Sequence, residues 1–366
     1  MSLLPICLSL SAVAGPPLSE TLEKAREEHD LPAMTAAVVN SEGLIESAAV
    51  GVRKAGGEEP VTVEDRFALG SCTKSFTATL IASLIEDGTL RGDMRLGEIF
   101  AGGLKGARRT NRVHPQMAGA KIDELLAHTS GMIADAGNSP AWIALFTDKR
   151  PARVSRRELV AEVLAQPPGG EREKYEYSNL GYVTLAVIAE EATGSSYEEL
   201  VTERILKPLG LESAVFRTNE TARAGDVWGH DDDGEPGDPT SSFAENPAAF
   251  SPAGTLHMNV LDWARWARWH LAGDPAPVLN TQDAYDRMHE PLTGPDAGGN
   301  PYGHGWILLE TPNGPAYTHG GSNTAFFSLI WVLPKRDVAV VVLTNQGSGF
   351  PACDAVAGQA MQQFGK

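Results

Sequence analysis

A serine and a lysine stand three residues apart at the start of an expected helix, in the stretch ALGSCTKSFTATLIASLIEDG at residues 68–88. That spacing makes the two side chains neighbours on a helix surface. Lys74 falls on the apolar side with Ile81 and Ile85, away from the polar strip, and burial lowers the pKa of a lysine. A neutral amine can accept a hydroxyl proton, so the pair predicts nucleophilic catalysis by Ser71 with Lys74 as its base.

The position of Ser71 at a helix start favours the same chemistry. The positive end of the helix dipole stabilises negative charge that develops on an attacking oxygen. The backbone N–H of Ser71 could also serve as one donor of an oxyanion hole. The alternative is purely structural: Lys74 extends to solvent, and Ser71 only caps the helix. Cys72 faces away from Lys74 and is no rival nucleophile.

Two further motifs follow in the chain. Tyr177-Ser178-Asn179 precedes a helical run in residues 167–194, and His319-Gly320-Gly321 ends an expected strand in YTHGGSN. Together with SCTK, in this order, they resemble the motifs S-x-x-K, Y-x-N and K-T-G or H-x-G of the serine β-lactamase and penicillin-binding protein superfamily. The likeness extends to LLAHTSGM (125–132), SPAGTLHMNVLDWARW (251–266) and VVVLTNQ (340–346).

The resemblance is strongest to the class C β-lactamase-like branch, which holds D,D-peptidases, D-aminopeptidases, amidases, family VIII esterases and true β-lactamases. It implies that Ser71 is the acylated nucleophile, with Lys74 as its base partner. Tyr177 would be the second proton-transfer group, with its phenol near Lys74. The alternative for Tyr177 is a core tyrosine whose hydroxyl caps a backbone group.

The same resemblance implies a set of substrate-binding groups. Asn179 would bind the amide or carbonyl of the substrate, and the backbone N–H of Ser322 would be the second oxyanion donor. Gly320 and Gly321 would let the strand approach the substrate closely. His319 stands where β-lactamases carry a lysine, so it would hold a substrate carboxylate weakly near pH 7 and better toward pH 6. The alternative is a structural strand-end histidine.

These residues predict a serine hydrolase that forms an acyl-enzyme with small esters, amides or peptides, of the esterase or D-peptidase/amidase type. The alternatives are a true β-lactamase, or a penicillin-binding-type protein that is acylated without fast turnover. No metal or other cofactor is expected, because neither H-E-x-x-H nor a paired Cys/His spacing occurs. The partner is a small-molecule or peptide substrate, and the oligomeric state is left open.

The elements that must position these residues predict an α+β fold. A first helix is expected at about 19–29, then a hairpin that turns at Asn40-Ser41-Glu42-Gly43. The chain becomes largely helical from Phe67 and returns to strands near its C-terminus, before a last helix at 355–364. We therefore expect one antiparallel sheet built from both termini and flanked by helices, in a lobe of residues 15–66 plus 300–366. A mostly helical lobe, 67–299, would be inserted.

Composition narrows the partners further. The chain has 366 residues and a net charge of −17, which disfavours binding to nucleic acid or anionic membranes. No segment is apolar enough for a membrane span. Of the remaining features, 229–239 is interpreted as a solvated turn, and 104–114 as a surface loop or a substrate-steering segment. Trp263, Trp266 and Trp269 are interpreted as packing residues.

The N-terminus resembles an export signal. A short apolar run precedes Ala12-Val13-Ala14, an A-x-A cleavage pattern, although no Lys or Arg precedes the run. This predicts a signal peptide at residues 1–14 and a periplasmic or secreted protein. The alternative is an unprocessed start and a cytoplasmic location.

Overall fold

The computed structural model describes residues 15–104, 112–135, 140–217, 221–223, 225–294, 300–323 and 325–366. The expected signal peptide, residues 1–14, lies outside the described residues, as does most of the basic segment 104–114. No helix in the described ranges is both long and apolar enough to cross a bilayer.

A seven-stranded antiparallel sheet forms one half of the molecule, in the order β2-β1-β12-β11-β10-β9-β8. The first two strands come from the N-terminal part of the chain and the other five from the C-terminal part, and the two parts join where β1 pairs with β12. The fold is thus the α+β arrangement that the sequence predicts. The strands are β1 (Ala33–Val39), β2 (Leu44–Gly51), β8 (Tyr302–Gly303), β9 (Trp306–Thr311), β10 (Gly314–Ser322), β11 (Phe327–Leu333) and β12 (Val338–Thr344).

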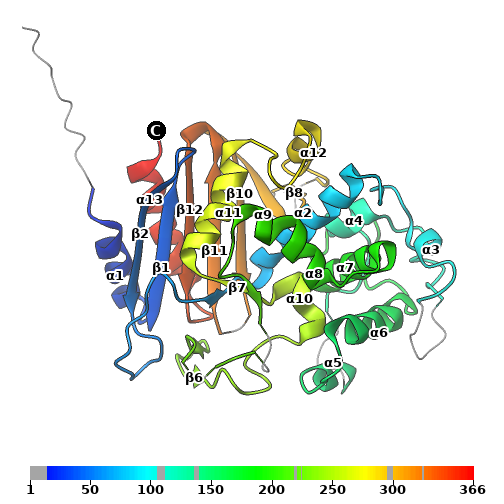
Figure 1. Ribbon diagram of the computed structural model, residues 1–366, viewed down its shortest axis with the longest axis horizontal. Helices are drawn as coiled ribbons and strands as arrows, with labels where there is room; N and C mark the ends of the chain where they lie inside the picture. The colour runs from blue at the N-terminus through cyan, green and yellow to red at the C-terminus, as the bar shows by residue number, and fades with distance from the viewer. Residues whose placement is uncertain are drawn as a thin grey trace, which may run out of the picture.

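Helices cover both faces of the sheet. β1 and β12 are buried along their whole length, and apart from Thr35 and Thr344 they consist of apolar residues, as strands covered on both faces require. On one face lie α1 (Leu18–Glu28) and α13 (Phe350–Phe364), which also contact each other (Figure 1). On the other face α11 (Val260–Ala272) packs against β1, β11 and β12.

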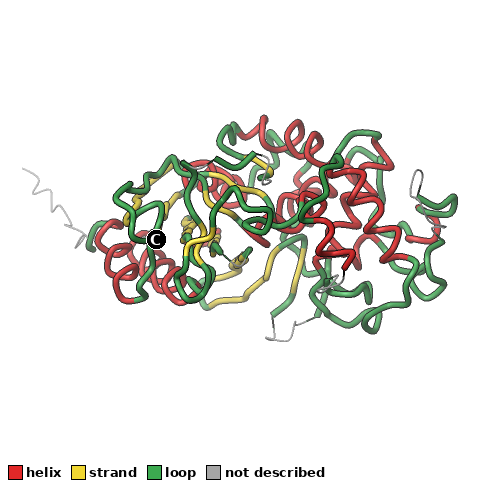
Figure 2. Tube along the Cα trace, turned by 90° about the horizontal axis from the view of Figure 1, so that it is seen from below, coloured by secondary structure: helices red, strands yellow, loops and turns green. Residues whose placement is uncertain are grey.

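The middle of the chain forms a mainly helical region beside the sheet. Figure 2 shows the strands lying between the terminal helices and this larger group of helices. Its elements are η1 (Gly70–Cys72), α2 (Thr73–Glu86), α3 (Leu96–Ile99), α4 (Ile122–Leu126), α5 (Pro140–Leu145), α6 (Ala152–Leu164), α7 (Asn179–Thr193), α8 (Tyr197–Val201), η2 (Thr202–Leu206), α9 (Lys207–Leu209), η3 (Ala248–Phe250), α10 (Ser251–Gly254) and α12 (Gln282–Arg287).

Two features differ from the expected lobes. First, α11 lies inside the range 67–299 but packs on the sheet. Its tryptophans Trp263, Trp266 and Trp269 are buried there, which confirms that they are packing residues. Second, a small sheet of β3 (Phe67–Ala68), β7 (Leu256–Met258) and β4 (Val215–Phe216) interrupts the helical region. The segment 229–239 forms the short hairpin of β5 (Gly229–His230) and β6 (Pro236–Gly237).

Candidate active site

Ser71 lies in the one-turn helix η1, which runs directly into α2. Helix α2 crosses the interior and is buried from Thr73 to Leu84, because α7, α8, α10 and α12 pack around it and Trp266 of α11 stacks on Phe76. Three residues of the polar strip, Ser75, Thr79 and Ser83, are therefore buried as well. Their hydroxyls are satisfied by the helix itself, as in the bonds from Ser75 to the Cys72 carbonyl (2.9 Å) and from Thr79 to the Ser75 carbonyl (2.8 Å).

The amine of Lys74 is fully buried and has three hydrogen-bond partners. Nζ lies 2.6 Å from Oδ1 of Asn179 and 3.0 Å from the carbonyl oxygen of Ala253, both of which can only accept. The third partner is the hydroxyl of Ser71, also at 3.0 Å, which can donate or accept. A neutral amine has two N–H donors and one lone pair. It matches this set if the Ser71 hydroxyl donates to it.

The electrostatics of Lys74 favour the same state. Burial is the main cause that lowers its pKa, to about 7, and the negative charge of Asp135 partly opposes that shift. A large fraction of Lys74 is therefore neutral near pH 7. The structural alternative, in which Lys74 extends to solvent, is wrong.

Tyr177 completes the group around the nucleophile. Its ring centroid lies 4.8 Å from Nζ of Lys74. Burial raises the pKa of Tyr177 well above its usual value, against a smaller lowering by a side-chain hydrogen bond with Ser71. The phenol is therefore protonated in the resting protein and can donate.

The ring of His128 packs against the ring of Tyr177. The two rings are 4.3 Å apart, and Nδ1 of His128 accepts a 3.1 Å hydrogen bond from the backbone N–H of Ser178. Burial lowers the pKa of His128 well below its usual value, so the ring packs as a neutral imidazole. His128 lies in the quoted LLAHTSGM segment, but the sequence assigned it no role.

Asn179 is the first residue of α7, and the preceding Ser178 caps that helix by accepting from the N–H of Gly181 at 3.0 Å. The amide of Asn179 is fixed from both ends: Oδ1 accepts from Lys74, and Nδ2 donates to Oδ1 of Asp135 at 2.9 Å. Asp135 was not predicted as a site residue. It extends the chain of contacts from Ser71 through Lys74 and Asn179.

The end of β10 lies against η1, and glycines allow that approach. A Cβ on Gly321 would lie 2.1 Å from the carbonyl oxygen of Leu69 and 2.8 Å from the backbone nitrogen of Ser71. A Cβ on Gly70, whose φ is +48°, would lie 2.6 Å from the backbone nitrogen of Ser322. The backbone nitrogens of Ser71 and Ser322 therefore lie on neighbouring segments, as two oxyanion donors would require.

His319 corrects one expectation. Its ring is 4% exposed and is held between the hydroxyl of Tyr302, 3.1 Å from Nε2, and the carbonyl of Gly320, 2.6 Å from Nδ1. Burial is the main cause that lowers its pKa to about 4, and Lys74 adds to the effect. The imidazole therefore stays neutral at pH 6, and the expected gain of positive charge there is wrong.

The carbonyl that holds Lys74 belongs to the short helix α10. Thr77, one turn further along α2, donates at 2.7 Å to the adjacent carbonyl of Pro252 and lies 2.7 Å from the hydroxyl of Tyr197. Two side chains of α2 thus fix two successive carbonyls of α10.

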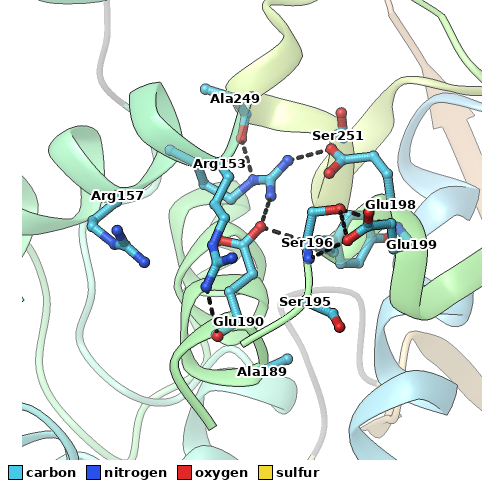
Figure 3. Close-up of polar contacts among 12 residues, drawn as sticks. Arg153, Arg157, Ala189, Glu190, Ser195, Ser196, Glu198, Glu199, Ala249 and Ser251 are labelled. Atoms are coloured by element: carbon cyan, nitrogen blue, oxygen red, sulfur yellow. Dashed lines mark hydrogen bonds and ion pairs between the residues drawn. The ribbon is translucent and has the colours of Figure 1, made fainter. Parts of the chain in front are cut away.

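A buried ion network supports α10 from the other side. The guanidinium of Arg156, on α6, bonds to the carboxylates of Glu190 and Glu198 and to the carbonyl of Ala249, the last at 3.2 Å. Figure 3 shows Glu190, Glu198 and Ala249 converging from three different elements. This network connects α6, α7, α8 and η3, the turn that leads into α10.

A cavity of about 300 Å³ opens beside the nucleophile. Of the predicted residues, Ser71, Asn179 and Ser322 line it, whereas His319 does not. The other lining side chains, to which the sequence analysis assigned no role, include Asp135, Trp142, Asn246, Phe250 and Asn323.

The buried thiol of Cys72 does not compete with Ser71 as a nucleophile. Burial raises the pKa of Cys72 to about 12, and its thiol bonds to the carbonyl of His319 at 3.3 Å, so it is a poor nucleophile. Within the described part of the chain, no cluster of three or more His, Cys, Asp or Glu side chains could hold a metal ion.

Comparison with known proteins identifies the family of the chain. The profile of the Beta-lactamase family matches residues 18–361. Penicillin-binding protein 4 of Amycolatopsis lactamdurans is 29% identical over 347 residues, which are 90% of this chain and 84% of that protein.

Solved structures share the fold. A class C β-lactamase from Rhodobacter sphaeroides superimposes with a TM-score of 0.74 at 20% identity, over 94% of this chain and 98% of that one. A D-stereospecific amidohydrolase from Streptomyces sp. gives 0.71 at 21% identity, over 93% and 98%. The chain therefore belongs to the Beta-lactamase family, whose superfamily consists of serine hydrolases and includes penicillin-binding proteins.

Proposed function

We propose that this protein hydrolyses small esters, amides or peptides through an acyl-enzyme on Ser71. The observation that carries the proposal is the buried Lys74 amine, with two acceptor-only partners and the Ser71 hydroxyl as its third. When the amine is neutral, its two N–H groups can serve the two acceptors, and its lone pair is left for the proton that must leave for Ser71 to attack.

In acylation, the Ser71 oxygen bonds to the substrate carbonyl carbon while its proton passes to Nζ of Lys74. The carbonyl π pair moves to the oxygen, which the backbone N–H groups of Ser71 and Ser322 stabilise. When the tetrahedral intermediate collapses, the bond to the leaving group breaks. Tyr177 delivers a proton to the leaving group and is reprotonated from Lys74.

Deacylation repeats these steps with water as the nucleophile. Water gives its proton to the Lys74–Tyr177 pair and bonds to the acyl carbon. The Ser71 oxygen then leaves and recovers the proton. Both half-reactions end with neutral Lys74 and a protonated phenol, which are the states that the pKa shifts favour.

The charges around the cavity support neutral substrates over β-lactams. A β-lactam carries an anionic carboxylate, which a cationic side chain would hold best. His319 is buried and neutral, and the only charged side chain that lines the cavity within the described residues is Asp135. We expect ready turnover of p-nitrophenyl acetate or butyrate and poor turnover of penicillins and cephalosporins.

The test is steady-state hydrolysis of both classes by the wild type, Ser71→Ala and Ser75→Ala. Ser75 is a matched control, because it is a buried serine of the same segment whose hydroxyl, among the described residues, bonds to the backbone carbonyl of Cys72 and to no catalytic side chain. Ester hydrolysis should depend on Ser71 and survive in Ser75→Ala. Full ester activity in Ser71→Ala would contradict the proposal. Cephalosporin turnover at pH 7.5 that equals ester turnover would indicate a true β-lactamase instead.

A further inference from the structure

The cavity next to Ser71 has an unbalanced charge. Its amide groups, from Asn179, Asn246 and Asn323, are neutral, and its aromatic side chains Trp142 and Phe250 are apolar. Among the described residues that line it, Asp135 alone carries a full charge. A substrate group that neutralises this charge would therefore be favoured over one that adds to it.

The carboxylate of Asp135 is both positioned and accessible. Oδ1 accepts from Nδ2 of Asn179 at 2.9 Å, which orients the carboxylate, and the side chain is exposed at the cavity. No hydrogen bond to the other oxygen, Oδ2, occurs among the described residues. A single amide, that of Asn179, separates Asp135 from Lys74, which contacts the nucleophile. A positive group bound at Asp135 would thus lie close to a carbonyl under attack by Ser71.

The aromatic side of the cavity suits the same kind of ligand. The rings of Trp142 and Phe250 pack at 4.4 Å and 66°, and both side chains line the cavity with Ala253 and Gly254. This surface can hold the apolar part of a small acyl group, and aromatic faces also attract cations.

We propose that Asp135 selects substrates that carry a positively charged amino group close to the scissile carbonyl, as in an amino-acid amide or a peptide with a free amino terminus. This inference rests on the proposed serine hydrolase function and specifies its substrate class. An ammonium there would donate to Oδ2 of Asp135, a charge-assisted hydrogen bond. N-acylation would remove that donor and its charge, and an anionic acyl group would be repelled.

Asp135 could instead act only on Lys74, because its charge raises the pKa of the amine. The two roles make different predictions. An effect through Lys74 would change the turnover of every substrate by the same factor and shift the pH profile. Recognition of the substrate would change the ratio between charged and uncharged compounds.

The experiment measures competition against p-nitrophenyl butyrate hydrolysis at pH 7 by three anilides. Alanine anilide is cationic, N-acetylalanine anilide is neutral and N-succinylalanine anilide is anionic, each used in the D and L forms. Competition reports binding whether or not an anilide is hydrolysed. For at least one enantiomer, the cationic compound should compete roughly 10-fold better than the acetylated one, as for a hydrogen bond to a charged group. The succinylated one should be the weakest.

Asp135→Asn should bring the ratio of cationic to acetylated compound near one, since an asparagine can still accept from Asn179. Asp232→Asn is the control, because it removes one negative charge from an exposed loop position that does not line the cavity. Asp232→Asn should leave the ratio of cationic to acetylated compound as it is in the wild type. Equal competition in the wild type, or a preference that persists in Asp135→Asn, would overturn the inference. Failure of the proposed function would give a different result: the wild type would not hydrolyse p-nitrophenyl butyrate at all.

Discussion

At the scale of single residues, the site depends on one buried amine and on contacts that only glycine permits. Ser71 and Lys74 could be predicted because helical spacing alone makes them neighbours. The other two partners of Lys74 could not be read from such spacing. Asn179 and Ala253 lie 105 and 179 residues away in the chain, and only the folded packing brings them to the amine.

The two glycines of the third motif should respond differently to alanine. Gly321→Ala should lower kcat/KM for p-nitrophenyl butyrate by at least about 10²-fold, the scale of losing one oxyanion donor. Its Cβ would collide with the backbone of Leu69 and Ser71. Gly320→Ala should lose far less, because its Cβ would meet the ring of Phe327 at 3.2 Å, and a side chain can shift. Equal losses in the two variants would contradict the close approach of β10 to η1.

His319 shows why a motif position does not fix a charge. The sequence places a histidine where relatives carry a lysine, and an exposed histidine would gain charge near pH 6. The structure instead buries the ring beneath Tyr302 and next to the carbonyl of Gly320. That environment depends on β8, a two-residue strand with no pattern of its own.

At the scale of elements, the long periodic segments were predictable and the short ones were not. Helices α1 and α11 show a helical hydrophobic period, whereas α7 and β1 are long, mostly apolar segments that are buried on all sides. The strands β3, β4 and β7 have two or three residues each, too few to show alternation. The ion network that supports α10 could not be predicted either, because its charged residues belong to three different helices, α6, α7 and α8.

That network should matter for stability. Arg156→Ala should lower the free energy of unfolding by about 3–5 kcal/mol, because Glu190 would remain buried without its charge partner. Arg157→Ala is the matched control on the same helix. Its pair with Glu191 is partly exposed, so the loss should be at most about 1 kcal/mol. Urea unfolding measures both, and similar losses would refute the structural role of Arg156.

At the scale of the whole molecule, the sheet separates two hydrophobic clusters. One joins the sheet to α2, α7 and α11, around the site. The other lies under α1 and α13 on the opposite face. The overall plan could be predicted because strands occur at both ends of the chain and helices between them. The packing of α11 on the sheet could not be predicted, since its amphipathic pattern does not show whether it covers the sheet or other helices.

The second cluster should stabilise the fold without affecting catalysis. Leu22→Ala removes a fully buried side chain of α1 and should cost about 2–5 kcal/mol in unfolding free energy. At a temperature where the variant is folded, its kcat/KM should equal that of the wild type. Leu44→Ala, at an exposed position, should change stability by no more than about 0.5 kcal/mol. A loss of kcat/KM in fully folded Leu22→Ala would show that the two faces are coupled.

The central claim is that neutral Lys74 activates Ser71. The most direct measurement is the rate and position of covalent labelling by a neutral p-nitrophenyl alkylphosphonate diester between pH 5 and 9. Since the base must be unprotonated and its pKa is about 7, labelling should rise with pH through a midpoint near 7. Well below that midpoint it should fall roughly tenfold per pH unit.

Peptide mapping should find the label on Ser71, and Lys74→Met should be labelled slower by a factor on the order of 10³. A label on Cys72 or another serine would contradict the account, as would a Ser71 labelling rate that does not change with pH.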